Sequence, residues 1–348
     1  MFEVLGILSI VMIFTTIAPH LPGQHWLIRV WEFPRVQQIC IILVAIIGWV
    51  SYLVIEQTDS LIIFATVILL LCLAYQISWV YPYSSFGPKE VSRVKTPQQD
   101  RVFSIMTSNV YMHNKNYQGL IDLVTKHKPD MLVTLESNQD WEDAMEPIHN
   151  DYPYRLACPL ENLYGMHLYS RLPFKEETIR YIVQDGVPSM QVTIEVEGQP
   201  VVVYLLHPKP PSPTENESAG PRDEELTLVG QEVVAEDRPV IIAGDLNDVA
   251  WSPTTRNFRK QTGARDPRRG RGFFNTFHAK YKLIRWPLDH VFHSDHFDLV
   301  KIKRLPGYGS DHFPLYTSLH LTRDCEQCES SSAPQTSEAA SIESNKES

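Results

Sequence analysis

The chain has 348 residues, of which 43% are hydrophobic and 21% are charged, with 16 Gly and 25 Pro. This composition excludes collagen-like, low-complexity and wholly disordered proteins. The net charge of −10 divides into −2 for residues 1–86, −4 for residues 87–321 and −4 for residues 322–348. Because the long middle part is nearly balanced in charge, the composition does not indicate a whole-domain basic surface for bulk nucleic-acid binding.

Three uncharged hydrophobic segments occupy the N-terminal part, at residues 4–18, 39–55 and 60–81. A helix that crosses a bilayer needs about 20 apolar residues, and the second and third segments meet this length. The first segment is shorter and has a cleaved signal peptide as its alternative, but it lacks a basic leader, and Pro19-His20 follows where small residues would mark a cleavage site. The sequence therefore predicts about three transmembrane helices.

Basic residues near these segments favour one orientation in the membrane. Arg29 and Arg35 lie in the first loop, and three basic residues follow the third segment, whereas the second loop has none. Cytoplasmic loops carry an excess of Lys and Arg, so this count places the large domain in the cytoplasm. We expect a multi-pass protein of the plasma membrane with its larger domain on the cytoplasmic side.

The rest of the chain divides by composition. We expect a membrane region at residues 1–86, a Pro-rich polar linker at 87–100, a folded domain at 101–322 and a Ser/Glu-rich disordered tail at 323–348. Cys325 and Cys328 form C-x-x-C in the tail without a second pair to complete a zinc site. This pair is either incidental or a short redox loop.

Short apolar runs alternate with helical patterns in the folded domain. The predicted strands are residues 101–109, 131–136, 164–170, 189–196, 200–207, 239–244, 288–293 and 314–321, and the predicted helices are 116–127 and 222–236. Several strands follow one another without a helix, as at the Glu197-Gly198 turn. This order predicts an α+β sandwich with mixed sheets and not a purely parallel, doubly wound sheet.

Polar side chains stand at the ends of these apolar runs. They are Asn109, Glu136, His207, Asp245 with Asn247, Asp289, and Asp311 with His312. Each one alone is typical of a turn or of a structural histidine. Six such features in one domain, all acceptors or imidazoles, instead favour a shared crevice at the edge of the sheets.

The chemistry of this set suits phosphoester hydrolysis. Carboxylate and amide oxygens are better ligands for Mg²⁺ than for Zn²⁺, and a His with a carboxylate partner can activate water. The sequence has no P-loop, no G-x-S-x-G elbow and no H-E-x-x-H helix. Covalent serine chemistry and ATP hydrolysis are therefore disfavoured.

The order of motifs resembles one known superfamily. The motifs are S-N at 108–109, L-E-S at 135–137, G-M-H-L-Y-S-R at 165–171, L-L-H-P at 205–208, G-D-L-N-D at 244–248, L-D-H-V-F at 288–292 and G-S-D-H-F-P at 309–314. Together they are similar to the endonuclease/exonuclease/phosphatase superfamily over about residues 100–322, in a membrane-anchored, bacterial-type member. The resemblance implies a four-layer α/β/β/α sandwich.

The resemblance also implies roles for the polar residues. Asn109, Glu136 and Asp311 would hold Mg²⁺, with Mn²⁺ as an alternative. Asp289 would orient His312, which activates water or holds the phosphate. Asp245 and Asn247 would position the nucleophile and a phosphoryl oxygen, and His207 would be the general acid. The P-K-P-P run after His207 differs from the loop expected at this position in nuclease-like members of the superfamily.

One stretch between two of these motifs is strongly basic. Ten Lys and Arg residues lie between Arg256 and Arg285, with Asp266 as the only acidic residue. This stretch is either a solvated loop or a rim that attracts phosphate from nucleic acid or lipid headgroups.

We therefore predict a membrane-anchored, Mg²⁺-dependent hydrolase of phosphoester bonds, a phosphodiesterase or phosphatase, whose substrate is lipid-linked or lies near the membrane. A membrane-bound nuclease and a catalytically idle, membrane-tethered binding module are the alternatives. The expected partners are the lipid bilayer and a phosphoester substrate, which is a lipid headgroup, a nucleic acid or a small phosphodiester. No obligate protein partner is inferred.

Overall fold

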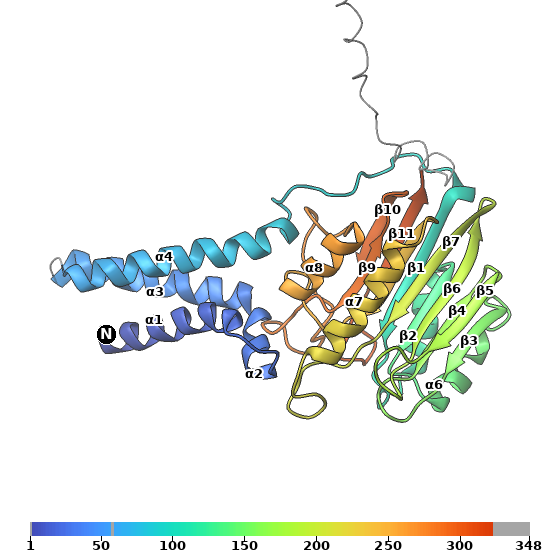
Figure 1. The fold of residues 1–348 in the computed structure, drawn as a ribbon, viewed down its shortest axis with the longest axis horizontal. Helices are drawn as coiled ribbons and strands as arrows, with labels where there is room; N and C mark the ends of the chain where they lie inside the picture. The colour runs from blue at the N-terminus through green and yellow to red at the C-terminus, as the bar shows by residue number, and fades with distance from the viewer. Residues whose placement is uncertain (1, 57–58, 323–348) are drawn as a thin grey trace, which may run out of the picture.

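The computed structural model describes residues 2–56 and 59–322 (Figure 1). Among these residues, three long apolar helices precede the folded domain: α1 (Phe2–Ile17), α3 (Arg35–Glu56) and α4 (Ser60–Val80). Their candidate spans have mean hydropathies of 2.0, 2.5 and 2.4, so each is long and apolar enough to cross a membrane. The predicted disordered tail and its pair of cysteines, Cys325 and Cys328, lie outside the described residues.

Two mixed sheets form the centre of the domain. Within residues 59–322 the strands are β1 (Val102–Asn109), β2 (Met131–Leu135), β3 (Tyr154–Cys158), β4 (Met166–Ser170), β5 (Glu176–Arg180), β6 (Ser189–Val196), β7 (Gln199–Leu206), β8 (Val240–Asp245), β9 (Asp289–His293), β10 (Phe297–Arg304) and β11 (Leu315–Leu321). The first sheet has the order β10-β11-β1-β2-β4-β3, and the second has the order β5-β6-β7-β8-β9.

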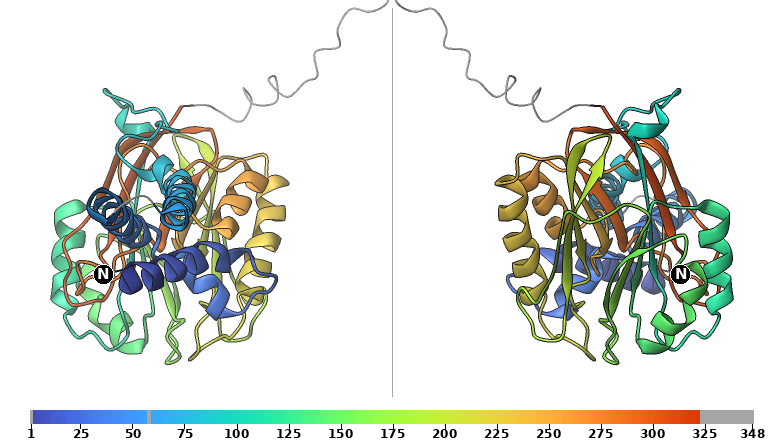
Figure 2. Two further views of the ribbon diagram at one scale, coloured as in Figure 1. Left: turned by 90° about the vertical axis from the view of Figure 1, so that its left-hand side faces the viewer. Right: turned by 90° about the vertical axis from the view of Figure 1, so that its right-hand side faces the viewer.

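Helices cover the outer face of each sheet, as Figure 2 shows in side view. The first sheet is covered by α5 (Tyr117–His127) and α6 (Gln139–Ala144), and the second by α7 (Gly220–Val234) and α8 (Pro253–Thr262). The two inner faces pack on each other through one apolar core. The domain is therefore a four-layer α/β/β/α sandwich, as the sequence predicts.

The central strands are mainly apolar because both of their faces are buried. On β1, Ile105 points into the core between the sheets, and the next residue, Met106, packs under the helices of the first sheet. On β8, Ala243 likewise packs in the core between the sheets, and Ile242 packs on the side covered by α7 and α8. Successive side chains of a strand point to opposite faces, so a strand buried on both sides needs an unbroken apolar run.

The sequence analysis does not predict three strands and two helices of the domain. β3, β5 and β10 lie at sheet edges, where many of their side chains are exposed and no continuous apolar run marks them. α6 is only six residues long, and α8 carries mostly polar residues. Edge strands and short surface helices are stabilised by a single packed face, which leaves a weak periodic signal.

The segment between α1 and α3 (residues 18–34, here the α1–α3 segment) is fixed to the domain. It includes the short helix α2 (Trp26–Arg29) and ends next to Arg35 of α3. The Trp26 amide donates to the carbonyl oxygen of Glu217 at 2.9 Å, and Trp251 Nε1 donates to that of Glu32 at 2.9 Å. These contacts bring the α1–α3 segment against the long loop at 208–219 and against the turn after β8.

Candidate active site

Two pairs of parallel strands deliver polar residues to the same edge of the sandwich. β1 pairs in parallel with β2, and Asn109 ends β1 while Glu136 directly follows β2. β7 pairs in parallel with β8, and His207 directly follows β7 while Asp245 ends β8. The carboxyl ends of parallel neighbours lie at one edge, which is where α/β sheets bind their ligands.

Antiparallel strands bring the remaining predicted residues to that edge from the opposite direction. Asp289 opens β9 and is the register partner of Asp245. Asp311 and His312 precede β11, which runs antiparallel to β1. A strand that starts where its neighbour ends places its first residues beside the neighbour's last ones.

Hydrogen bonds join these side chains into one cluster. Asn109 Nδ2 donates to Glu136 Oε1 at 2.8 Å and reaches Asp245 Oδ2 at 3.3 Å. His312 Nδ1 lies 2.8 Å from Asp289 Oδ2, and His312 Nε2 lies 3.5 Å from Asp245 Oδ2. The side chains of Asp245, Asp289 and His312 are all buried, so these interactions are shielded from water.

Asn247 is held in a left-handed turn that aims its side chain at the long loop. Its φ is 50°, its amide donates to Asp245 Oδ1 at 2.8 Å, and its Nδ2 donates to the carbonyl oxygen of Pro208 at 3.0 Å. Asn tolerates this backbone region better than most residues. Glu136 also has a positive φ, 54°, and such backbone strain is concentrated at functional sites.

Burial and neighbouring charges shift the pKa values of the cluster in different directions. Burial raises the pKa of Glu136 to about 8, and the carboxylates of Asp311 and Asp245 add to this effect. Burial alone would lower the pKa of His312, but Asp289 and Asp245 outweigh it and raise that pKa to about 10. His207 has no comparable partner, so burial lowers its pKa to about 4. One histidine is thus charged and the other neutral near pH 7.

The cluster has the donor chemistry of a divalent-cation site. Four carboxyl groups, those of Glu136, Asp245, Asp289 and Asp311, surround the imidazolium of His312. Within the described part of the chain, Asp289 Oδ1 is buried and has no hydrogen-bond partner. An excess of buried carboxylate oxygens without enough positive charge favours a hard cation such as Mg²⁺. The residues present therefore fit a divalent metal.

A cavity of about 700 Å³ opens beside this cluster. Its polar end contains Glu136, Asn247, Asp311 and His312, and its other walls are mainly apolar. Most of the apolar lining comes from three places: the α1–α3 segment (Val30, Trp31, Phe33 and Pro34), the long loop (Pro210 and Pro211) and the stretch before β9 (Phe277, Ile284, Trp286 and Leu288). Tyr111 and Leu163 complete it.

Aromatic rings connect the two ends of the cavity. The Phe277 ring lies 4.9 Å from the His312 ring and 6.2 Å from the stacked Trp286 ring, as measured between centroids. Trp286 in turn meets Phe33 of the α1–α3 segment edge to face at 5.7 Å. Such pairs are mutually attractive, so the rings form a continuous apolar wall from His312 to the α1–α3 segment.

The family model described as the Endonuclease/Exonuclease/phosphatase family matches residues 106–312, which include every polar residue of this cluster. The chain belongs to this family. Members of the family hydrolyse phosphoester bonds and generally depend on divalent metals. A search of curated proteins found no match.

Solved structures share the fold at low sequence identity. The human Nocturnin catalytic domain with bound sulfate has 14% identity and a TM-score of 0.52, over 65% of this chain and 97% of that one. A family protein from Leptotrichia buccalis has 17% identity and a TM-score of 0.52, over 63% and 99%. D. rerio TDP2 with a single-strand DNA product has 17% identity and a TM-score of 0.50, over 63% and 99%. These likenesses show the fold.

Three arginines of the basic stretch at residues 256–285 are used inside the protein. Arg268 is buried, pairs with Asp266 at 2.8 Å and donates to the carbonyl oxygen of Asp289 at 3.0 Å. Arg259 and Arg269 both pair with Glu90 of the linker. The interpretation of this stretch as a phosphate-attracting rim therefore fails for these arginines, because their charges are already neutralised. The part that borders the cavity is apolar.

The sequence analysis missed the part of the apolar wall that comes from the α1–α3 segment. Trp31 is an aromatic residue of the kind expected at a membrane surface, and nothing in the sequence joins it to Glu136 or His312. The long loop at residues 208–219 is one signal that the sequence offers, since long loops in compact domains are often functional. Its prolines do line the cavity.

Proposed function

We propose that this protein is a membrane-anchored, divalent-metal-dependent hydrolase whose substrate is a phosphoester carried on a lipid. The observation that carries the proposal is the cavity, which has acid and imidazole groups at one end and an apolar wall built from the α1–α3 segment at the other. A substrate that fits both ends has a phosphoester head and an apolar body. The three apolar helices support anchoring in the bilayer that contains such a substrate.

Asn109, Glu136 and Asp311 are the residues that would hold the metal, with Mg²⁺ or Mn²⁺ as the ion. When bound, the metal screens the phosphate charge and stabilises the leaving oxygen. Asn109 and Glu136 are already joined by a hydrogen bond at the ends of β1 and β2, and these two strands are held rigidly by the sheet. Oxygen ligands of this kind suit hard cations.

The other polar side chains of the cluster bind the phosphoryl oxygens, orient the nucleophile and transfer protons. Asp289 fixes the ring of His312 through Nδ1, which leaves Nε2 free to hold a phosphoryl oxygen or to exchange a proton with water. Asp245 and Asn247 position the nucleophile and a second phosphoryl oxygen. His207 is neutral near pH 7, and negative charge on a bound phosphate raises its pKa toward that of a general acid.

The walls of the cavity favour a lipid-linked substrate over nucleic acid. No Lys or Arg is among the described residues that line the cavity, and Glu215 adds a further acid to it. Nucleic-acid binding depends on cationic contacts with successive phosphates. Apolar surface instead gains free energy by covering acyl or isoprenoid chains, at about 25 cal/mol per Å² of buried area.

The experiment compares substrates on the full chain in nonionic detergent, because the α1–α3 segment is part of the cavity. The enzyme is incubated with Mg²⁺ or with EDTA against a phospholipid panel in mixed micelles, plasmid DNA and bis-(p-nitrophenyl) phosphate. We expect Mg²⁺-dependent cleavage of at least one lipid, slower turnover of the small diester and no DNA cleavage. The Glu136→Gln variant controls for contaminating hydrolases.

Two results would overturn the proposal. DNA cleavage that falls steeply with added salt, without lipid cleavage, would identify a membrane-bound nuclease. No turnover in any arm by a folded protein that binds Mg²⁺ would identify an idle, membrane-tethered binding module.

A further inference from the structure

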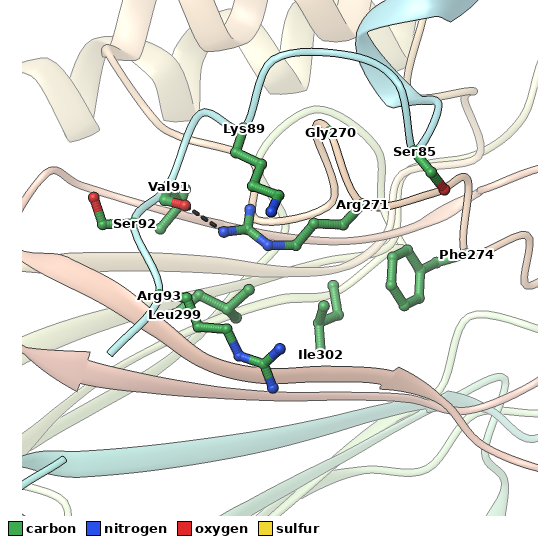
Figure 3. A pocket seen from close by; sticks show the side chains of 10 residues that line it. All are labelled: Ser85, Lys89, Val91, Ser92, Arg93, Gly270, Arg271, Phe274, Leu299 and Ile302. Carbon is green, nitrogen blue, oxygen red and sulfur yellow. Dashed lines mark hydrogen bonds between the residues drawn. The ribbon is translucent and has the colours of Figure 1, made fainter. Parts of the chain in front are cut away.

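A second pocket, of about 620 Å³, lies where the chain leaves α4 and reaches the domain (Figure 3). Its walls are the linker at residues 85–93, the turn at 270–274 and strand β10. It shares no lining residue with the catalytic cavity. Its floor is apolar, formed by Val91, Phe274, Leu299 and Ile302.

Three cationic side chains line this pocket: Lys89, Arg93 and Arg271. Lys89 and Arg271 lie side by side, and Arg93 extends from the linker toward β10 (Figure 3). None of them forms an ion pair with a carboxylate in residues 2–56 or 59–322. Glu90, the nearest acidic residue in the linker, is already shared by Arg259 and Arg269. Burial lowers the pKa of Arg271, and the positive charge of Arg93 lowers it further.

Neutral backbone groups fix the two guanidinium groups in place. Arg271 Nη1 donates to the carbonyl oxygen of Pro267 at 3.1 Å, and its Nη2 donates to that of Val91. Arg93 Nε donates to the carbonyl oxygen of Val300 at 3.3 Å. Carbonyl oxygens orient a guanidinium without cancelling its charge, so both side chains are positioned before any anion arrives.

The turn at Gly270 holds the linker against the domain. Gly270 has a φ of 71°, and its amide donates to the carbonyl oxygen of Pro82 at 2.8 Å. A Cβ at this position would lie only 2.6 Å from the Lys89 amide nitrogen and 2.7 Å from the Gly87 oxygen. The close packing requires glycine, and it keeps Lys89 beside Arg271.

We propose that this pocket binds the phosphate group of an anionic lipid headgroup. An arginine guanidinium can bind two phosphate oxygens at once, and an anion here would face like charges that have no carboxylate partner within residues 2–56 and 59–322. The linker follows directly from α4, the last of the three apolar helices, so the pocket lies close to the end of a candidate span. Bound lipid would hold the domain against the bilayer surface.

The test uses the full chain in dodecyl maltoside micelles and measures binding, which keeps it independent of hydrolysis. Phosphatidylglycerol, phosphatidylcholine and inorganic phosphate are titrated separately, and retained lipid is also read by native mass spectrometry. The variant is Lys89→Gln/Arg93→Gln, two exposed residues whose replacement leaves the bonds of Arg271 intact. The control is Lys301→Gln/Lys303→Gln, two exposed lysines on β10 with the same change of charge.

We expect phosphatidylglycerol to bind far more tightly than phosphatidylcholine. The Lys89→Gln/Arg93→Gln variant should weaken that binding by roughly 30-fold, and the control should leave it unchanged. Equal affinities of variant and control would overturn the proposal. Inorganic phosphate that binds as tightly as the lipid, and is lost in the same variant, would overturn lipid as the source. If the wild type and both variants hydrolyse no substrate, only the proposed function is refuted, because this test measures lipid binding.

Discussion

The two ends of the catalytic cavity are built in opposite ways. The polar end includes Glu136 and His312, which lie at strand ends. Buried hydrogen bonds and charges hold them in place, from Asn109 to Glu136 and from Asp289 and Asp245 to His312. The apolar end depends on Trp31 and Phe33, which lie outside the residues matched by the family model. The comparison shows that the polar end lies within the residues shared with the family, whereas part of the apolar end comes from a segment next to the apolar helices; under the proposed function this segment would select the substrate.

The largest effect is expected at the polar end. Glu136→Gln keeps the volume of the side chain and removes its charge, so metal binding and transition-state stabilisation are both lost. We expect kcat for bis-(p-nitrophenyl) phosphate to fall by about 1,000-fold. Glu215→Gln, at another acidic residue of the cavity, is the matched control and should change kcat only a few-fold. Wild-type activity in Glu136→Gln would refute the assignment of the metal site.

A somewhat smaller loss is expected when the partner of His312 is changed. Asp289→Asn keeps a hydrogen-bond partner at Nδ1 but removes the carboxylate that helps to raise the pKa of His312. The kcat should fall by about 100-fold, and the pKa of His312 should move down from about 10, as followed by NMR of labelled histidine. An unchanged pKa would mean that Asp289 does not orient this ring.

Mutations at the apolar end should lower the activity on lipid substrates and leave the activity on the small diester unchanged. Trp31→Ala/Phe33→Ala removes the part of the wall that comes from the α1–α3 segment. We expect kcat/KM for lipid substrates to fall by about 50-fold, since two large rings no longer cover the apolar body of the substrate. The same variant should hydrolyse the small diester normally. Equal losses on both substrates would show that the wall supports the catalytic residues themselves.

The smallest expected effect is a pH-dependent change in stability, and it comes from Glu32 in the α1–α3 segment. Burial, and next the carboxylate of Asp248, raise the pKa of Glu32 to about 7. A carboxyl group whose pKa is higher in the folded protein binds protons more tightly there, so its contribution to stability falls as the pH rises from about 4.5 to about 7.

Glu32→Gln should remove this pH dependence. Above pH 7 the variant should be more stable than the wild type, by on the order of 1 kcal/mol. Thermal unfolding measured between pH 5 and pH 8 checks the expectation. Parallel curves for the two proteins would mean that Glu32 ionises normally in the folded state.

Much of the fold and of the catalytic cluster could be predicted from the sequence. Apolar runs such as those ending at Asn109, Glu136 and Asp245 are visible because both faces of these strands are buried, and the polar group at each end interrupts the pattern. β3 and β5 could not be found in this way, because their exposed faces dilute the apolar signal. The roles of individual residues stay predictions until the variants are measured.

The sequence by itself determined the three apolar helices, the mixed α/β sandwich and the set of acid and imidazole groups, because each depends on a local pattern of hydrophobicity or on residue type. Only the tertiary structure decided which basic side chains are paired with carboxylates and which are available to bind a ligand. Glu90 neutralises Arg259 and Arg269, whereas Lys89, Arg93 and Arg271 have no carboxylate partner in the described chain. It also brought Phe33 to Trp286, more than 200 residues away. Such contacts follow from packing, which has no signature in a local stretch of sequence.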